Sequence, residues 1–284
     1  MLTNHRIFPE RIVPEVEIIL YYEKTLCDSS SEWIVLLHGL GGTLLSLKYQ
    51  IREYSKYYNI IAIELPGHGH SVSEPPPKVY DLETVAAKVV EVMDECGVER
   101  AHFMAVSIGT MIAVGVAAFH PQRVISMVQG AGILRFEWQM RLFAHPAVWS
   151  SKIFSHYTVY NFFASFIFPG KKHAFARRIF IKGAAQMGCE AFCAWVLFMF
   201  GRGRRLRDFI CRLNSLEKPI PQMYIMGEDD FLFRRSTPRL AGRIKGTETV
   251  VIEDAGHICN IERRKEFNRI SLEFFQKNRE QETV

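Results

Sequence analysis

Six short apolar runs, spaced along the chain, constrain its fold more than any other feature. Each is nearly continuous in hydrophobic residues, and the runs are 33–39, 59–67, 101–107, 124–130, 221–227 and 248–254. Their β-branched, uninterrupted apolar character is typical of strands that are buried on both faces of a sheet. Residues 82–97 carry apolar side chains at helical spacing and end in a glycine, which predicts a helix with its stop signal. This alternation predicts an α/β fold, in which a mostly parallel sheet carries helices on both faces.

The strand pattern stops after about residue 132 and resumes after about residue 214. The stretch between them is rich in aromatic residues, has helical character and contains no convincing strand. A chain of 284 residues is long enough for one α/β core with an inserted subdomain. We therefore predict a core formed by residues 1–132 and 215–284, and a helical cap, or lid, formed by residues 133–214.

Composition argues against several classes of protein. Hydrophobic residues make up 48% of the chain and charged residues 23%, which is ordinary for a soluble globular protein and argues against disorder. Residues 1–17 are interrupted by charges and two prolines and lack the apolar segment of a secretory signal, so we expect a cytoplasmic location. The uninterrupted apolar part of the cap, residues 191–201, is well short of the ~20 residues that a membrane-spanning helix requires.

The six cysteines lack the regular spacing of a disulfide framework. Cys189 and Cys193 lie one helical turn apart, as a metal-binding pair would, but no second pair of Cys or His residues lies close to them in sequence. We therefore predict structural cysteines rather than metal ligands.

Ser107 falls where an apolar run ends and a helical pattern over residues 108–119 begins, so it occupies a strand-to-helix corner. Such a corner needs small neighbours because the two backbones approach closely, and Ala105 and Gly109 supply them. The hydroxyl would project from the carboxyl edge of the sheet. The amide of Ile108 and the helix amino terminus beside it could stabilise an oxyanion. The alternative is a serine that only caps the helix.

A serine nucleophile needs a base, and the base needs an orienting acid. His257 follows an apolar run, and Gly256 allows a tight turn that could bring the imidazole over the sheet edge. Asp230 also follows an apolar run, so the chain order is Ser, Asp, His, each after a separate strand. Glycines within residues 36–42 free the backbone after a further strand, so the amide of Leu40 could be a second oxyanion donor.

The sequence resembles the α/β-hydrolase superfamily, in particular its cofactor-free members with a lid domain. Five segments carry this resemblance: LLHGLGG (36–42), ELPGHGHS (64–71), AVSIGT (105–110), GEDD (227–230) and DAGH (254–257). It covers nearly the whole chain. It implies about eight mostly parallel strands with a cap inserted after the sixth, and it implies that Ser107 is the nucleophile, Asp230 the acid and His257 the base.

The chain departs from the usual G-x-S-x-G pattern at one position, where Ala105 replaces the first glycine, a small change. A serine nucleophile argues against relatives that use aspartate there, such as haloalkane dehalogenases and epoxide hydrolases. Two acidic residues adjoin Asp230, and the resemblance favours the aspartate three positions after Gly227. We expect His68 and His70 to be structural or solvated. We expect His38 to support the loop of residues 38–42 that carries Leu40, here called the oxyanion loop.

The composition of the predicted cap suggests the kind of substrate and partner that the protein binds. Residues 153–168 and 187–200 are rich in Phe, Tyr, Trp and Met, which would pack on the core, line a pocket for an apolar acyl group, or both. Residues 133–214 hold thirteen Lys or Arg and three acidic residues, a net charge of +10 against +5 for the whole chain. This suggests an anionic partner: a membrane surface, a CoA or carrier-protein thioester, or a carboxylated substrate. A solvated face without a dedicated partner is the alternative. Nucleic acid is not expected, because no binding module surrounds the basic residues 202–207.

We therefore predict a serine hydrolase that cleaves an ester or thioester with a hydrophobic acyl or alcohol part through an acyl-enzyme. It would need no metal and no organic cofactor. The same residues could instead transfer an acyl group to an acceptor other than water, or hydrolyse an amide or a carbon–carbon bond. A third reading is a ligand receptor with little turnover, in which the basic lid carries the signal.

Overall fold

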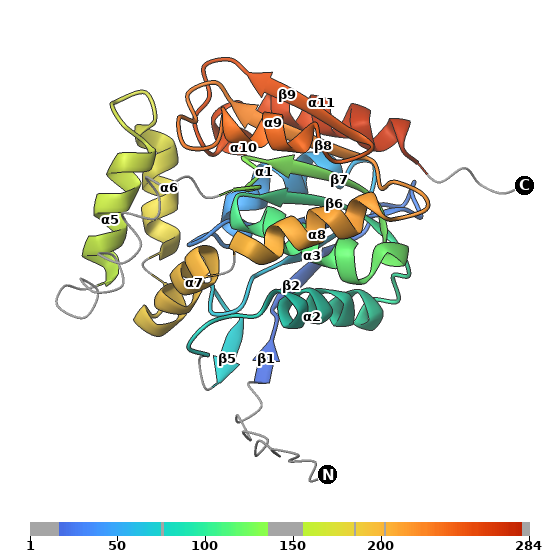
Figure 1. Ribbon diagram of the computed structural model, residues 1–284, viewed down its shortest axis with the longest axis horizontal. Helices are drawn as coiled ribbons and strands as arrows, with labels where there is room; N and C mark the ends of the chain where they lie inside the picture. Colours follow the sequence, from blue (N-terminus) through green and yellow to red (C-terminus); the bar gives the residue numbers. More distant parts are fainter. Residues whose placement is uncertain (1–16, 75–76, 136–155, 185, 202, 280–284) are drawn as a thin grey trace, which may run out of the picture.

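The computed structural model describes residues 17–74, 77–135, 156–184, 186–201 and 203–279. All six predicted runs are strands of one sheet: β3 (Trp33–Leu37), β4 (Asn59–Ile63), β6 (Ala101–Val106), β7 (Val124–Gly130), β8 (Gln222–Gly227) and β9 (Thr247–Ile252). With β2 (Tyr22–Thr25) they form the order β2-β4-β3-β6-β7-β8-β9. β2 runs antiparallel to β4 and the other neighbouring pairs are parallel, which confirms the predicted α/β architecture (Figure 1).

Two further strands, β1 (Glu17–Ile19) and β5 (Val72–Glu74), pair with each other in a separate antiparallel sheet. Within the described ranges the main sheet therefore has seven strands, where about eight were expected. The sequence gives little signal for β1 and β2, because they are three and four residues long and most of their side chains are at least partly exposed.

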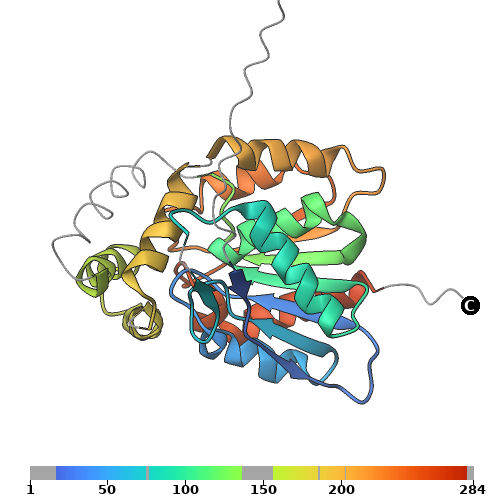
Figure 2. The same ribbon diagram turned by 90° about the horizontal axis from the view of Figure 1, so that it is seen from below.

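Helices cover both faces of the sheet (Figure 2). One face carries α2 (Leu82–Glu95), α3 (Ile108–Phe119) and α8 (Gly203–Asn214), and the other carries α1 (Leu44–Tyr54) and α11 (Arg264–Lys277). β4 and β6 are buried along their whole length, as strands covered on both faces must be. Short helices complete the connections: η1 (Pro121–Arg123), α9 (Ser236–Ala241) and α10 (Cys259–Glu262).

Between β7 and β8 the chain forms α5 (His156–Ile167), α6 (Ala174–Ala184), α7 (Cys189–Gly201) and then α8. We refer to α5, α6 and α7 with their connecting turns as the helical insertion. α5 and α6 pack against each other to one side of the sheet, whereas α8 packs on α3 of the core (Figure 1). Among the described strands the insertion follows β7, which is the fifth strand of the main sheet in chain order and the seventh when β1 and β5 of the small sheet are counted. Its predicted place after the sixth strand stays a prediction. The division into core and cap at residues 133 and 214 stays a prediction.

None of the helices in the described ranges combines the length and the apolar character needed to cross a membrane. The described part of α7 illustrates this, because it has 13 residues. A spanning helix needs about 20.

Gly109 shows why the corner after β6 needs a small residue. A Cβ atom at this position would lie 2.6 Å from the carbonyl oxygen of His38 and 2.8 Å from that of Leu37. The first turn of α3 therefore lies closer to the end of β3 than a side chain permits. The other small residue of the motif, Ala105, is fully buried in β6.

We expect Gly109→Ala to lower the free energy of unfolding by about 1–3 kcal/mol, because the new methyl group meets backbone atoms that cannot turn away. The gain in helix propensity, about 1 kcal/mol, is too small to offset this. Gly242→Ala is the matched control, since Gly242 has a φ of −60° and the nearest atom to its added Cβ would be 3.5 Å away. Urea unfolding of both variants measures the difference, and wild-type stability in Gly109→Ala would contradict the close approach.

Candidate active site

Ser107 lies between β6 and α3 with an unusual backbone. Its φ of 52° and ψ of −118° fall in a region that non-glycine residues seldom adopt, at a cost of roughly 1–3 kcal/mol. Its amide donates to the carbonyl of Gly130 (2.9 Å), and its carbonyl accepts from the amide (3.0 Å) and the hydroxyl (2.6 Å) of Thr110. Its own side chain makes no capping bond to α3, so the hydroxyl is left for another partner.

That partner is His257. Its Nε2 lies 2.9 Å from Oγ of Ser107, and its Nδ1 lies 2.9 Å from Oδ2 of Asp230. The imidazole is 4% exposed and the aspartate 2%. Because an ionised carboxylate only accepts hydrogen bonds, Asp230 holds the proton on Nδ1 and leaves Nε2 to accept from the serine. The structure thus brings the three predicted side chains together in one hydrogen-bonded chain.

The two acidic neighbours of Asp230 face elsewhere. Glu228 accepts a hydrogen bond from the amide of Asp254 (3.3 Å), and Asp229 accepts one from Nζ of Lys172 (2.6 Å). Of these three consecutive carboxylates, Asp230 is the one that bonds to the imidazole.

The loops after β8 and β9, here called the acid loop (residues 228–233) and the base loop (residues 253–258), are joined through their backbones. A Cβ atom on Gly227, the last residue of β8, would overlap the carbonyl oxygens of Ala255 and Gly256. The amide of Asp229 donates to the carbonyl of Ala255 (2.8 Å). The acid and the base therefore reach the edge of the sheet as one connected unit.

A small cavity lies beside Ser107 and His257. Its volume is about 40 Å³, which is room for a few water molecules. Its lining is mainly apolar and includes Leu40, Leu47, Val106, Ile179, Phe180, Ile258 and Ile261. Leu40, one predicted oxyanion donor, thus borders the same cavity as the serine. Ile108, the other, is the first residue of α3 and is fully buried.

Two buried histidines fix the loop that carries Leu40. His38 accepts at Nε2 from the amide of Leu65 (2.9 Å), and His68 accepts at Nε2 from the amide of Gly41 (2.9 Å). Burial lowers the pKa of His38 to about 3, with a further contribution from the nearby His68. Burial also lowers the pKa of His68 to about 4. Both rings are therefore neutral at pH 7 and act as hydrogen-bond acceptors in the loop.

Three polar residues that the sequence did not single out also hold these loops. Tyr160 of α5 donates to the carbonyl of Leu40 (2.9 Å), and Trp195 of α7 donates to the carbonyl of Pro66 (2.9 Å). Glu64 is 3% exposed and accepts two backbone amides (3.2 and 2.7 Å). The aromatic residues of the insertion therefore do more than pack: two of them bond to the loops beside the site.

Other sequence predictions meet the described residues only in part. Arg141, Lys152 and Arg202 of the basic set lie outside them. Cys189 and Cys193 lie on α7. In the part of the chain that the structure describes, no group of three or more His, Cys, Asp or Glu residues could hold a metal ion.

Comparison with known proteins gives a family match. The family model described as "Alpha/beta hydrolase family" matches residues 34–270. The enol-lactonase from Burkholderia xenovorans LB400 has a similar structure, with a TM-score of 0.78 and 22% identity over 90% of this chain and 96% of that one. At this level of identity the structural likeness shows the fold.

Curated relatives have varied names. The dihydrolipoyllysine-residue acetyltransferase component of the acetoin cleaving system from Pseudomonas putida is 24% identical over 247 residues, which are 86% of this chain and 64% of that protein. Epoxide hydrolase 4 of Mus musculus is 25% identical over 123 residues, 43% of this chain and 31% of that protein. The chain spans 25% and 64% of the lengths of the two acetyltransferase components that it matches.

The buried histidines predict how stability depends on pH. Burial lowers the pKa of His38, of His68 and of His102, a fully buried residue of β6, in the folded state. The unfolded chain therefore binds more protons once the pH falls below about 6.5. The stability they contribute is full above about pH 6.5 and is lost as the pH falls through the folded-state pKa values of about 4 for His68 and about 3 for the other two. Each histidine adds a slope of up to about 1.4 kcal/mol per pH unit.

Urea unfolding between pH 7 and pH 5 measures this dependence. We expect His68→Gln, which keeps an acceptor but cannot take up a proton, to reduce the slope by about one proton's share. A free energy of unfolding that does not change between pH 7 and pH 5 would contradict the assignment of neutral, buried rings.

Proposed function

This chain belongs to the alpha/beta hydrolase family, and we propose that it is a serine hydrolase that cleaves a carboxylic ester or thioester. The observation that carries the proposal is the hydrogen-bonded chain from Ser107 through His257 to Asp230, with both distances at 2.9 Å. A serine whose hydroxyl bonds to a neutral imidazole, itself oriented by a carboxylate, is an activated nucleophile.

The reaction follows from the positions of the protons. His257 Nε2 takes the proton of the Ser107 hydroxyl while Oγ bonds to the carbonyl carbon of the substrate, and Asp230 stabilises the imidazolium that forms. The imidazolium then gives the proton to the leaving alcohol or thiol, and an acyl-enzyme remains. Water adds to the acyl carbon as His257 takes its proton. The imidazolium then returns that proton to Oγ of Ser107 as the bond between Oγ and the acyl carbon breaks, and the acid is released.

The amides of Leu40 and Ile108 are the proposed donors to the oxyanion. Ile108 begins α3, so its N–H lies at the positive end of the helix dipole, and Leu40 borders the cavity. Each donor would lower the barrier by about 3 kcal/mol, because the charge develops in a site that excludes most water. His38 and His68 support the same arrangement by holding the loop that presents Leu40.

The cavity supports a substrate with an apolar group next to the reacting carbonyl. Its lining is mainly aliphatic, with Phe180 and Ile179 contributed by α6. The nucleophile also favours acyl chemistry over epoxide opening, the activity named for one relative. A serine oxygen that opened an epoxide would form an ether, which water does not hydrolyse, whereas an acyl-enzyme is hydrolysed.

Acyl transfer is a second candidate, because two matched relatives are named as acetyltransferase components. It would use the same acyl-enzyme and differ only in the acceptor, an alcohol, amine or thiol in place of water. The two candidates therefore separate at the second half of the reaction.

We expect wild-type protein to react with a fluorophosphonate probe at Ser107 and to hydrolyse p-nitrophenyl esters of short acids. Ser107→Ala should abolish labelling and reduce kcat by more than about 10⁴-fold, because the residues of such a chain act as a unit. Ser55→Ala, which removes a hydroxyl at the far end of α1, is the control and should keep wild-type rates. Mass mapping of the probe and stopped-flow assays check both; labelling elsewhere, or full turnover by Ser107→Ala, would reject the proposal.

Hydrolysis should place one oxygen from solvent in the released acid. In water labelled with oxygen-18, with an added alcohol or pantetheine thiol as competing acceptor, we expect mass spectrometry to find most of the acyl group as singly labelled acid. A product in which most of the acyl group is joined to the added acceptor would favour the acyltransferase instead.

A further inference from the structure

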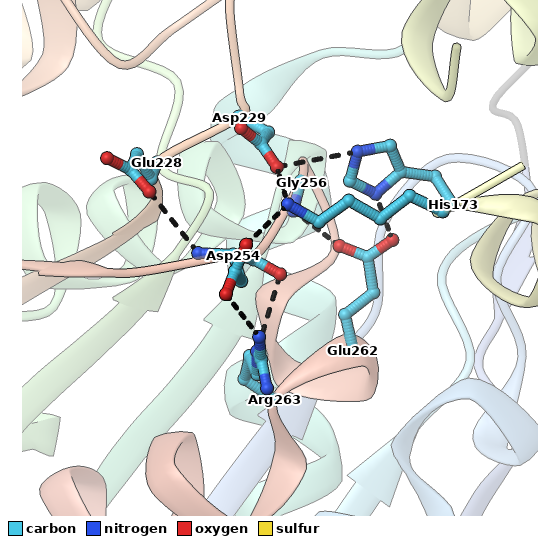
Figure 3. Close-up of polar contacts among 8 residues, drawn as sticks. His173, Glu228, Asp229, Asp254, Gly256, Glu262 and Arg263 are labelled. Carbon is cyan, nitrogen blue, oxygen red and sulfur yellow. Dashed lines mark hydrogen bonds and ion pairs between the residues drawn. The ribbon is translucent and has the colours of Figure 1, made fainter. Parts of the chain in front are cut away.

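The turn between α5 and α6 brings two polar residues, Lys172 and His173, against the acid and base loops. Figure 3 shows His173 beside Asp229 and Glu262, close to Gly256. These contacts join the helical insertion to two core segments that lie 57 and 89 residues further along the chain. The mechanism above uses none of these side chains.

On the side of the base, His173 acts through Glu262. Nδ1 of His173 donates to Oε1 of Glu262 (2.7 Å), and the other carboxylate oxygen accepts the amide of Gly256, the residue before His257 (Figure 3). Both side chains are largely buried, at 7% and 10% exposed. A Cβ atom on Gly256 would lie 3.0 Å from Nδ1 of His173 and 3.1 Å from Oε2 of Glu262. The backbone that leads into the base is therefore clamped between the insertion and α10.

On the side of the acid, Lys172 acts through Asp229. Its Nζ donates to Oδ2 of Asp229 (2.6 Å), the residue before Asp230, and to Oδ1 of Asp254 (2.8 Å) in the base loop. The hydrogen bond from Lys172, followed by the charges of Lys172 and Arg263, holds the pKa of Asp254 below its usual range. The lysine side chain is 49% exposed, so solvent screens its ion pairs, and they hold the two loops less firmly than the buried contact of His173 does.

We propose that His173, assisted by Lys172, is a positioning residue that sets the geometry of the catalytic base. The dipeptide fixes the residues immediately before the acid and the base, so the place of the α5–α6 turn determines how His257 meets Ser107. This role rests on the proposed serine hydrolase. Small displacements matter here, because moving a reacting group by about 1 Å can cost about 100-fold in rate.

The test is the rate at which a fluorophosphonate probe labels the full-length chain, measured over a range of probe concentrations. His173→Ala should lower the maximal rate constant by about 10- to 100-fold and change the half-saturating concentration little, because proton removal is impaired and probe binding is not. His173→Asn should recover most of the rate, since its amide N–H₂ can donate to Glu262. Lys172→Ala should have a smaller effect, and Lys171→Ala, with the same change of charge at an exposed neighbour, should have none.

Circular dichroism and thermal unfolding establish that each variant is folded. If His173→Ala does not fold, Glu262→Gln keeps the shape of the side chain and tests the same clamp, with a lower maximal rate expected. A folded His173→Ala that is labelled at the wild-type rate, or a folded His173→Asn that is no faster than His173→Ala, overturns the positioning role. Absence of labelling in the wild type rejects the serine hydrolase itself and this role with it, so the two failures are distinguishable.

Discussion

The backbone of Ser107 is the constraint on which the rest of the site depends. A residue held at a φ of 52° stays there only where its surroundings fix it, and the hydrogen bonds to Gly130 and Thr110 do so. The corner also crowds its neighbours: a Cβ atom on Gly39 would lie 3.1 Å from that of Ser107, and Gly109 lies against the carbonyls at the end of β3. The strained backbone of Ser107 has a structural consequence: it directs the hydroxyl toward the imidazole of His257 at the edge of the sheet.

The three histidines near the site differ in the hydrogen-bond partners of their rings. His38 and His68 each accept a backbone amide at Nε2, and a protonated ring could not do so. Burial therefore favours the protonation state that the oxyanion loop requires. His257 is also buried, but its Nδ1 faces the carboxylate of Asp230. A carboxylate at this position can stabilise an imidazolium, so His257 is suited to take up a proton during a reaction. The Nδ1 atoms of His38 and His68 instead face backbone carbonyls.

The sequence predicts the six long strands and the residues that follow them because both depend on local pattern. Ser107, Asp230 and His257 each follow an apolar run, and parallel strands bring their carboxyl ends to one edge. The support of these residues could not be predicted in this way. The bond from Tyr160 to Leu40 spans 120 residues and that from Trp195 to Pro66 spans 129. The periodicity of a helix does not predict which distant loop its polar atoms will contact. From the sequence, Tyr160 and Trp195 could therefore be assigned only to core packing or to the lining of a pocket.

The described contacts divide the work between core and insertion. Hydrogen bonds with β7 and α3 hold the backbone of the nucleophile. From the insertion, α5 bonds to Leu40, α7 bonds to Pro66, and the α5–α6 turn bonds to Glu262 of α10. The cavity beside Ser107 is shared, because α6 supplies Ile179 and Phe180 to its wall and the loops after β3 and β9 supply Leu40 and His257. His173, which directly precedes α6, belongs to the clamp on the base loop. Among the described residues, hydrogen bonds from the insertion thus reach the loops of Leu40 and Pro66 and, through Glu262, that of Gly256, whereas β7 and α3 bond to the serine backbone. A change in the insertion is therefore expected to act on charge stabilisation and proton transfer more than on the backbone of the nucleophile.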